Sequence, residues 1–430
     1  MTWESETDAR AGQGGASAKT MKNISIDGAR LWESLMEMAK IGATEKGGNC
    51  RLALTDLDRE GRDLFVRWCE AAGCTVSVDA MGNIFARRPG RDPGLAPVMT
   101  GSHLDTQPTG GRFDGVYGVL AGLEVIRTLN DHGIETEAPV EAVVWTNEEG
   151  ARFAPAMTAS GVFAGVFDLD YAHARADPDG KTLGAELERI GYKGDAECGG
   201  REVKAYFEAH IEQGPILEAE GKPIGVVTGA QGQRWFEITV TGAECHAGTT
   251  PMDRRRDALA GAAGMVTEVR RIATSRPPHA VATVGVLNSS PNSRNTIPGR
   301  VFFTVDLRHP KDGTLSAMAA EFRAACDAIA AEAGLACEIE EIWYFAPIAF
   351  DADCVAAVRQ GADALGYGHL DIVSGAGHDA CYLAKVAPTG MIFVPCKDGI
   401  SHNEIESAEP DDLAAGCNVL LHAVLERAGG

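Results

Sequence analysis

The sequence predicts an α/β fold in which one domain is interrupted by a second, smaller domain. Apolar strands alternate with long amphipathic helices in the first part of the chain, which is typical of a sheet covered by helices on both faces. The middle of the chain changes to the order β-α-β-β-α-β, the order of a ferredoxin-like unit, before the first pattern returns. A length of 430 residues leaves room for both domains.

The predicted domain boundaries follow these changes of pattern. Residues 1–21 are polar, small and rich in Gly and Ser, and we interpret them as a disordered leader. The main domain then covers residues 22–229 and resumes at 344–430. The inserted domain covers residues 230–343. No internal repeat divides the chain further.

The main domain begins with amphipathic helices and short strands. Apolar residues recur three and four positions apart in the predicted helices, and continuous apolar runs mark the buried strands. In chain order these patterns predict helices over Gly28–Ala39 and from Asp56, strands over Thr75–Asp79, Ile84–Arg88 and Ala96–Ser102, a helix over Val116–Leu129 and a strand over Val140–Thr146. Thr55 or Asp56 can cap the second helix.

The inserted domain has its own series of elements, after which the main domain resumes. The predicted series is a strand over Trp235–Thr241, a helix over Asp257–Thr274, strands over Ala280–Leu287 and Arg300–Leu307, a helix over Leu315–Ala333 and a strand over Ala336–Ile342. The main domain continues with a helix over Ala352–Leu365, a strand over Met391–Val394 and a helix from Pro410.

The composition excludes several classes of protein. Acidic residues outnumber basic ones by 61 to 39, giving a net charge of -22, whereas a nucleic-acid binder needs a basic face. The 11 cysteines form no C-x-x-C pair, so we expect reduced thiols rather than a disulfide framework or a thiolate zinc site. No apolar run has the length of a membrane helix, and no secretory signal is present. We therefore expect a cytoplasmic protein.

One candidate site begins where a predicted strand ends in the segment GSHLD, which contains His103 and Asp105. Residues two apart in an extended chain point the same way, so His103 can be a metal ligand while the Asp105 carboxylate orients its ring. Asp114 follows shortly, just before the predicted helix at Val116. Taken alone, Asp114 is better explained as a cap of that helix than as a site residue.

Further polar residues follow other predicted strands. Glu148 and Glu149 come directly after a buried strand, at the edge where α/β sheets bind ligands. One of the two can ligate a metal while the other carries a proton, and a solvated acidic turn is the equal alternative. His210 and His402 also follow apolar segments. Together these side chains supply enough nitrogen and oxygen donors for two divalent ions.

The chain resembles the hydantoinase/carbamoylase branch of the M20 metallopeptidase-like amidohydrolases. This branch includes N-carbamoyl-L-amino acid hydrolases, β-ureidopropionases and allantoate amidohydrolases. The resemblance runs from about Gly28 to the C-terminal helix and rests on the segments GSHLDTQPTGGRFDGVYGVLAGLEV, WTNEEGARF, HIEQGPILE, HAGTTPMDRRRDAL, PNSRNTIPG, DLRHP, SGAGHDA and KDGISHNEIE. It implies a discontinuous catalytic domain with an inserted lid and dimerisation domain, in agreement with the layout predicted from periodicity.

The resemblance implies a site with two divalent metal ions. Zinc is the first candidate, and manganese, cobalt and nickel are the alternatives. The implied ligands are His103 and His210 for one ion, Glu149 and His402 for the other, and Asp114 as the bridge between them.

The same resemblance assigns the acid–base and donor roles. Glu148 is the expected general base. His246 is expected to donate a hydrogen bond to the substrate carbonyl oxygen as negative charge develops on it. Together with Asn295, His246 is expected to reach the site from the lid of a partner subunit, which makes the enzyme a homodimer through the lid.

Three further positions are expected to bind the substrate. The planar fork of Arg308 suits a substrate carboxylate, the alternative being a salt bridge to Asp306 or Glu341. Gln213 and the loop around Gly377 are expected to line the substrate pocket.

The implied reaction is hydrolysis of the ureido C–N bond of an N-carbamoyl-L-amino acid or of 3-ureidopropionate. The products are the free amino acid, ammonia and carbon dioxide. An allantoate amidohydrolase is the nearest alternative. An aminoacylase or dipeptidase on the same scaffold comes next, followed by a catalytically silent binding protein.

Overall fold

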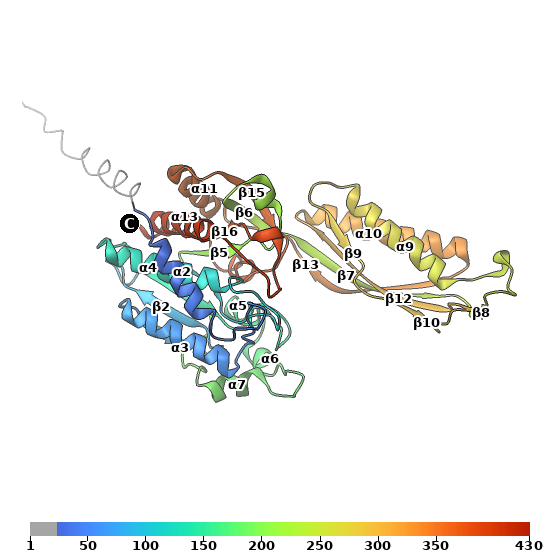
Figure 1. Cartoon of the computed structure of the whole chain (residues 1–430), viewed down its shortest axis with the longest axis horizontal. Helices are drawn as coiled ribbons and strands as arrows, with labels where there is room; N and C mark the ends of the chain where they lie inside the picture. The colour runs from blue at the N-terminus through green and yellow to red at the C-terminus, as the bar shows by residue number, and fades with distance from the viewer. Residues whose placement is uncertain (1–23) are drawn as a thin grey trace, which may run out of the picture. The chain divides into compact units, whose positions relative to one another are not determined.

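The computed structural model describes residues 24–430, so the predicted leader lies outside the described residues. The chain divides into two compact units, which are drawn in Figure 1. Unit 1 contains the described residues up to Thr228, together with Phe350–Ile372 and Gly377–Gly430. Unit 2 contains Gly229–Ala349 and Val373–Ala376. The fold is therefore mixed α/β, with the second unit encoded inside the first.

Unit 1 is built on a mixed sheet whose four central strands are parallel. Their order is β4-β3-β5-β16. The strands of the sheet, from one edge to the other, are β1 Thr75–Val78, β2 Ile84–Arg88, β4 Val140–Trp145, β3 Val98–His103, β5 Ala205–Ile211, β16 Thr389–Val394 and β6 Ile224–Ala230, with β15 His369–Ser374 also paired to β6. The short strand β14 Ile348–Ala349 pairs with Gly229 and Ala230 at the end of β6, and these residues fall within unit 2. The four parallel strands end at the same edge of the sheet.

Helices cover both faces of this sheet. On α4, Gly122 lies against Thr100 and Ala142 of the two neighbouring parallel strands. On α5, Phe163 packs edge-on against Trp145 with a centroid distance of 5.1 Å. Because side chains alternate along a strand, Ala142 and Trp145 point to opposite faces, so α4 and α5 lie on opposite faces.

The helices of unit 1 differ widely in length. They are α2 Gly28–Met38, α3 Asp56–Ala71, α4 Val116–Asp131, α5 Thr158–Phe163, α6 Leu169–His173, α7 Leu183–Ile190, α8 Ile216–Glu220, α11 Ala352–Leu365, α12 Asp379–Leu383 and α13 Pro410–Ala428, with the short 3-10 turn η2 at Lys397–Gly399. The cap of α3 is Thr55, whose side chain accepts a hydrogen bond from the Asp58 N–H. Among residues 24–430, no helix is long and apolar enough to cross a membrane. All eleven cysteines fall in this range and are free thiols.

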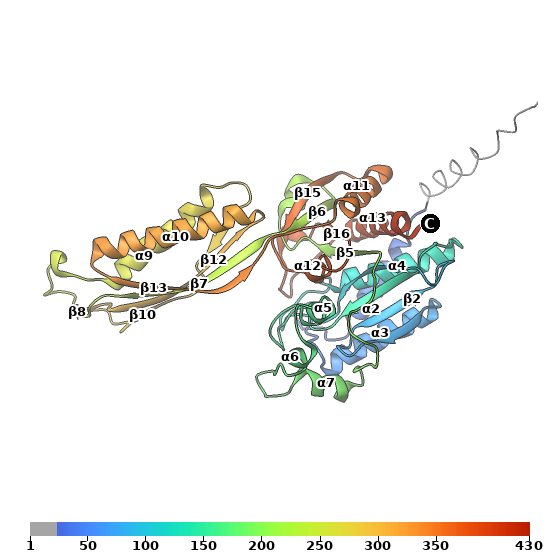
Figure 2. The same cartoon turned by 180° about the vertical axis from the view of Figure 1, so that it is seen from behind.

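Unit 2 is an antiparallel sheet covered on one face by two helices. Its elements are β7 Gly232–Thr241, β8 Cys245–His246, η1 Met252–Arg254, α9 Ala258–Thr274, β9 Val281–Thr283, β10 Leu287–Ser290, β11 Thr296–Ile297, β12 Arg300–His309, α10 Asp312–Ala333 and β13 Ala336–Phe345. The strand order is β10-β12-β7-β13, with β9 also paired to β12. Figures 1 and 2 show α9 and α10 lying together on the same side of these strands.

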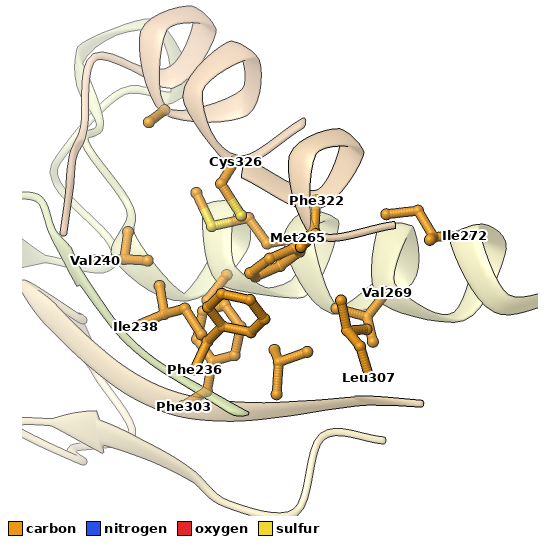
Figure 3. Packing of buried hydrophobic residues seen from close by; sticks show 14 of the residues in the cluster. Phe236, Ile238, Val240, Met265, Val269, Ile272, Phe303, Leu307, Phe322 and Cys326 are labelled. Atoms are coloured by element: carbon orange, nitrogen blue, oxygen red, sulfur yellow. The ribbon is translucent and has the colours of Figure 1, made fainter. Parts of the chain in front are cut away.

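The core of unit 2 follows from alternation along β7. Phe236, Ile238 and Val240 are fully buried and point to the helix-covered face, as Figure 3 shows. The ring of Phe236 lies 5.7 Å from that of Phe322 on α10. Burial of these side chains stabilises the packing of the two helices on the sheet, because each apolar side chain removed from water contributes about 1.5–3 kcal/mol to the free energy of folding.

Two predictions about the inserted segment differ from the structure. The strand predicted over Ala280–Leu287 is two strands, β9 and β10, because the chain bulges between them. Thr283 pairs with Asp306 and Leu287 with Phe303, so this chain has one residue more than its partner across the interruption. The second difference is in the last strand, which was predicted to end at Ile342 but continues as β13 to Phe345, where it still pairs with Gln233 of β7.

Candidate active site

The central parallel strands of unit 1 bring the candidate site residues to one edge of the sheet. His103 is the last residue of β3, and His210 lies next to the end of β5. Glu148 and Glu149 follow β4, and His402 follows β16. The carboxyl ends of parallel strands are the usual ligand-binding edge of an α/β sheet, and the structure places all five residues there.

His103, His210 and Asp114 form a buried cluster. The Asp114 Oδ1 atom lies 3.1 Å from His210 Nε2 and 3.8 Å from His103 Nε2. One donor atom of each residue falls within 4.8 Å of the other two. Two imidazole nitrogens and a carboxylate oxygen at this spacing can hold a divalent metal ion.

Asp114, Glu149 and His402 form a second cluster that shares Asp114 with the first. Asp114 Oδ2 lies 3.4 Å from His402 Nε2, which in turn lies 3.5 Å from Glu149 Oε2. Asp114 therefore presents one carboxylate oxygen to each cluster. The interpretation of Asp114 as a helix cap is wrong, because Gly115 is the cap of α4 and no side chain caps that helix.

The two histidines of the first cluster are held in the tautomer that a metal ion needs. His103 Nδ1 lies 2.8 Å from the backbone oxygen of Asp105, and His210 Nδ1 lies 2.9 Å from that of Ile211. A carbonyl oxygen only accepts, so each ring in its neutral form carries its hydrogen on Nδ1 and has a lone pair on Nε2. Both Nε2 atoms face Asp114.

Asp105 supports the site in a different way from the one predicted. Its backbone oxygen, rather than its carboxylate, contacts the His103 ring. The carboxylate instead accepts hydrogen bonds from the backbone N–H groups of Glu148 and Glu149, each at 3.2 Å. Asp105 therefore fixes the turn that follows β4 as well as the imidazole at the end of β3.

Gly115 allows the first cluster to close. Its φ angle is +68°, and a Cβ atom at this position would come within 2.3 Å of the His103 ring. Its N–H also donates to His210 Nε2 at 3.1 Å. Only glycine combines the left-handed backbone with this close approach.

Glu148 is buried beside the first cluster and is suited to accept a proton. Its Oε2 atom lies 3.5 Å from His103 Nε2. Burial raises the pKa of Glu148 well above its ordinary value, and the nearby charges of Asp379 and Glu149 add to the effect. The side chains of Glu148 and Glu149 are only 9% and 5% exposed, so the alternative of a solvated acidic turn is wrong.

The electrostatics of the site favour a bound cation. Burial lowers the pKa of His103 to about 4. For His210 burial also acts to lower the pKa, but its hydrogen bond to Asp114 and that group's charge raise it to about 9. The pKa of Glu149 is raised by burial and by the charges of Asp114 and Asp105. Buried carboxylates that oppose one another's ionisation, next to imidazole lone pairs, fit divalent metal ions.

Gln213 contacts Asp114, the residue that the two clusters share. Its Nε2 donates to Asp114 Oδ2 at 2.9 Å and to Ser401 Oγ at 3.2 Å. Gln213 and His402 both have positive φ angles, of 56° and 52°. Such backbone conformations are costly for residues other than glycine and gather at functional sites.

Two supporting residues were not among the predicted site residues, and a third, His378, belongs to the loop around Gly377 that is expected to line the substrate pocket. Glu406 accepts hydrogen bonds from the backbone N–H groups of Phe113 and Asp114 at 2.9 and 3.2 Å. Glu208 on β5 accepts from Ser102 Oγ at 2.7 Å. The ring of His378 lies 4.5 Å from that of His210. Glu208 could have been recognised from the sequence, because it lies two residues before His210 and so shares its face of the strand.

His246 and Asn295 are neighbours in unit 2. The Ala247 N–H donates to the backbone oxygen of Asn295 at 2.9 Å, where the short strands β8 and β11 pair. His246 Nδ1 accepts hydrogen bonds from the N–H groups of Gly248 and Thr249 at 3.0 and 3.2 Å. The neutral ring therefore carries its hydrogen on Nε2, which leaves an N–H donor on an exposed side chain.

Arg308 and Gly377 belong to different parts of the structure. The Arg308 guanidinium pairs with Asp306 at 2.7 Å and donates to the backbone oxygen of Gly375 at 2.8 Å. The predicted alternative, a salt bridge to Asp306, is therefore present. Gly377 is in unit 1, where a Cβ atom would come within 2.9 Å of the Met157 side chain.

Comparisons with known proteins agree with this geometry. An N-carbamoyl-L-amino-acid amidohydrolase from Rhizobium meliloti is 56% identical over 407 residues, covering 95% of this chain and 98% of the relative. A protein of that name from Geobacillus stearothermophilus is 39% identical, covering 94% and 100%. A crystal structure from Burkholderia multivorans, described as an amidase of the hydantoinase/carbamoylase family, has a TM-score of 0.93 and 68% identity, covering 95% and 99%.

The family model for peptidase family M20/M25/M40 matches residues 99–426. This match includes both clusters and all of unit 2. The chain therefore belongs to peptidase family M20/M25/M40.

Proposed function

We propose that this chain is a two-metal amidohydrolase that cleaves the ureido C–N bond of N-carbamoyl-L-amino acids, producing free amino acid, ammonia and carbon dioxide. The observation that carries the proposal is the pair of donor clusters joined by Asp114, with the buried carboxyl group of Glu148 beside them. The names of the relatives from Rhizobium meliloti and Geobacillus stearothermophilus point to the same substrate class.

In this proposal His103 and His210 hold one ion, Glu149 and His402 hold the other, and Asp114 bridges them. Zinc fits the donor set, as do manganese, cobalt and nickel. When bound, divalent ions polarise a carbonyl group and make water acidic enough to attack it at neutral pH.

Glu148 moves the proton in the proposed reaction. Its raised pKa suits a group that takes a proton from the attacking water and later gives it up near neutral pH. The oxygen of that water bonds to the ureido carbon, the bond from this carbon to the nitrogen of the amino acid breaks, and Glu148 passes the proton to that nitrogen. The carbamic acid left behind decomposes to ammonia and carbon dioxide, so all atoms are accounted for.

Unit 2 is proposed to be a ferredoxin-like lid through which two subunits dimerise. Arg308 would bind the substrate carboxylate, which requires it to exchange its bond with Asp306 for one with the substrate. At one end of β12, Arg300 pairs with Thr241, which lies shortly before β8. Arg308 lies eight residues further along β12, so Arg300 and Arg308 are ~26 Å apart. His246 and Arg308 thus lie at opposite ends of the sheet, which supports a role for His246 and Asn295 in a partner's site.

The proposal is tested by measuring ammonia release from a panel of compounds with protein stripped by a chelator and reloaded with each metal. The panel contains N-carbamoyl-L-amino acids, 3-ureidopropionate, allantoate and N-acetyl amino acids. We expect metal-dependent ammonia release from N-carbamoyl-L-amino acids. Ammonia release from allantoate alone would identify the protein as an allantoate amidohydrolase. Release of free amino acid from N-acetyl amino acids without ammonia would identify it as an aminoacylase. Silence with every metal would support a binding protein.

A further inference from the structure

Gln107 holds the carboxylate of Glu149 with two separate hydrogen bonds. Its backbone N–H donates to Glu149 Oε1 at 3.1 Å, and its side-chain Nε2 donates to Glu149 Oε2 at 2.8 Å. Because each oxygen is bonded from the same residue, both the position and the plane of the carboxylate are fixed. Oε2 is also the atom that lies 3.5 Å from His402 Nε2, so the side-chain bond acts on the oxygen that faces the second cluster.

The fold explains why these two residues meet. Strands β3 and β4 are neighbours and parallel, with His103 opposite Trp145. Gln107 and Glu149 each lie four residues beyond those partners, so the two chains continue side by side past the strand ends. A further hydrogen bond joins the loops after β3 and β4, in which the Glu149 N–H donates to the Asp105 carboxylate.

The chemistry of an amide suits this position. A neutral donor stabilises the ionised carboxylate of Glu149 without cancelling the negative charge that attracts a cation, whereas a lysine or arginine would compete with the ion. No comparable contact from Gln107 to the His103–His210 cluster is found among the described residues.

We propose that Gln107 is a positioning residue for the second metal ion: it holds Glu149 in the orientation that the ion requires, and loss of its side-chain amide weakens that ion while sparing the first. The inference rests on the proposed two-metal function and extends it to a residue outside the ligand set. Groups that hydrogen-bond to a metal ligand commonly change metal affinity by about 10–100-fold when they are replaced.

The experiment compares wild-type protein with Gln107→Met and Gln107→Ala. Methionine keeps the length of the side chain but has no N–H donor, so it separates hydrogen bonding from packing. Gln360→Met is the matched control, because Gln360 is an exposed glutamine of α11 in the same unit. Each metal-free protein is titrated with Zn²⁺ against a chromophoric chelator, the metal content after dialysis is measured by mass spectrometry, and thermal unfolding of the metal-free forms is recorded.

For Gln107→Met we expect the first zinc ion to bind as in wild type and the second about 10–100-fold more weakly. Dialysed protein should then retain close to one ion where wild type and Gln360→Met retain two. Two ions bound with wild-type affinities would overturn the proposal, and so would equal weakening of both ions, which would mean that Gln107 supports the whole edge of the sheet. Wild type that never takes up a second ion would overturn the two-metal function itself, and the role of Gln107 with it.

Discussion

At the scale of single residues, His103 and His210 show how the same side chain acquires different properties from its neighbours. Both rings are buried and both donate through Nδ1 to a backbone oxygen. Only His210 lies within 3.1 Å of an Asp114 oxygen, and its pKa is raised to about 9 while that of His103 is lowered to about 4. A cation bound between the rings would remove this difference, because both Nε2 atoms would then have to be unprotonated.

Replacement of Glu148 tests the general base. Glu148→Gln should leave the metal content unchanged, because Glu148 is not one of the proposed ligands, and should lower kcat by about 10²–10⁴-fold. Glu202→Gln is the control, since Glu202 is an exposed glutamate of unit 1. Metal content and the rate of ammonia release are measured on the same samples. A variant with its full metal content and wild-type turnover would show that another group accepts the proton.

The sequence could predict which residues gather at this site better than it could predict their contacts. His103, Glu149, His210 and His402 follow strand ends, so their placement at one edge follows from the fold class. The role of Asp105 could not be predicted in the same way. Whether its carboxylate or its backbone oxygen meets the imidazole depends on the path of the chain over a few bonds.

At the scale of elements, segments with a clear apolar pattern were predictable, whereas the shortest helices were not. The helix over Ala352–Leu365 and the strand over Ile84–Arg88 have the predicted bounds. The short helices α5, α6 and α8 were missed because five or six residues are too few to show a periodicity. These helices depend on tertiary contacts instead, as when α5 packs its aromatic ring against the sheet.

Arg152 stabilises one of these irregular regions, between β4 and α7. Its guanidinium donates to Asp177 at 3.0 Å, to Glu186 at 2.7 Å and to the backbone oxygen of Ala53 at 3.0 Å. Arg152→Met should lower the free energy of unfolding by about 1–3 kcal/mol, because the largely buried carboxylates of Asp177 and Glu186 each lose a charged donor, although Glu186 keeps its salt bridge to Arg189. Urea unfolding measures the change. Arg254→Met, at an arginine whose side chain is 79% exposed, should change it by less than about 0.5 kcal/mol.

The effect of Arg152 should also depend on pH. Burial acts to raise the pKa of Asp177 and of Glu186, but their hydrogen bonds, including those from Arg152, lower both below the ordinary values. A lowered carboxyl pKa in the folded state stabilises the protein above the unfolded-state pKa, and this contribution is lost as the pH falls through the folded-state pKa. The stability difference between wild type and Arg152→Met should therefore be full at pH 7 and shrink below about pH 4. A difference that stays constant down to pH 3 would argue against the ion pairs as its source.

At the scale of the whole molecule, the two units divide the proposed tasks. Every proposed metal ligand belongs to unit 1, whereas His246, Asn295 and Arg308 belong to unit 2. Unit 2 has its own buried core between the sheet and its two helices. The proposed metal ligands thus lie in one compact unit, while part of the proposed substrate contacts lie in a unit with a separate core.

Replacement of residues 234–342 by a short linker tests this division. The shortened chain should be monomeric, should keep two metal ions and should release no ammonia, because the proposed dimer interface and substrate contacts are removed together. Light scattering after gel filtration gives the oligomeric state, and a cooperative urea transition verifies that unit 1 is folded. A shortened chain that remains dimeric would place the interface in unit 1.

The insertion of unit 2 between His210 and His402 also has a consequence for synthesis. His103, Asp114, Glu149 and His210 leave the ribosome before unit 2 is made, whereas His402 follows about 190 residues later, a delay of roughly 10–40 s at 5–20 residues per second. The newly made chain thus carries three of the four donors around Asp114 while its last ligand is still being translated. Slow translation, or ribosomes that stall within unit 2, would lengthen the period in which the incomplete site, without His402, is exposed to metal ions.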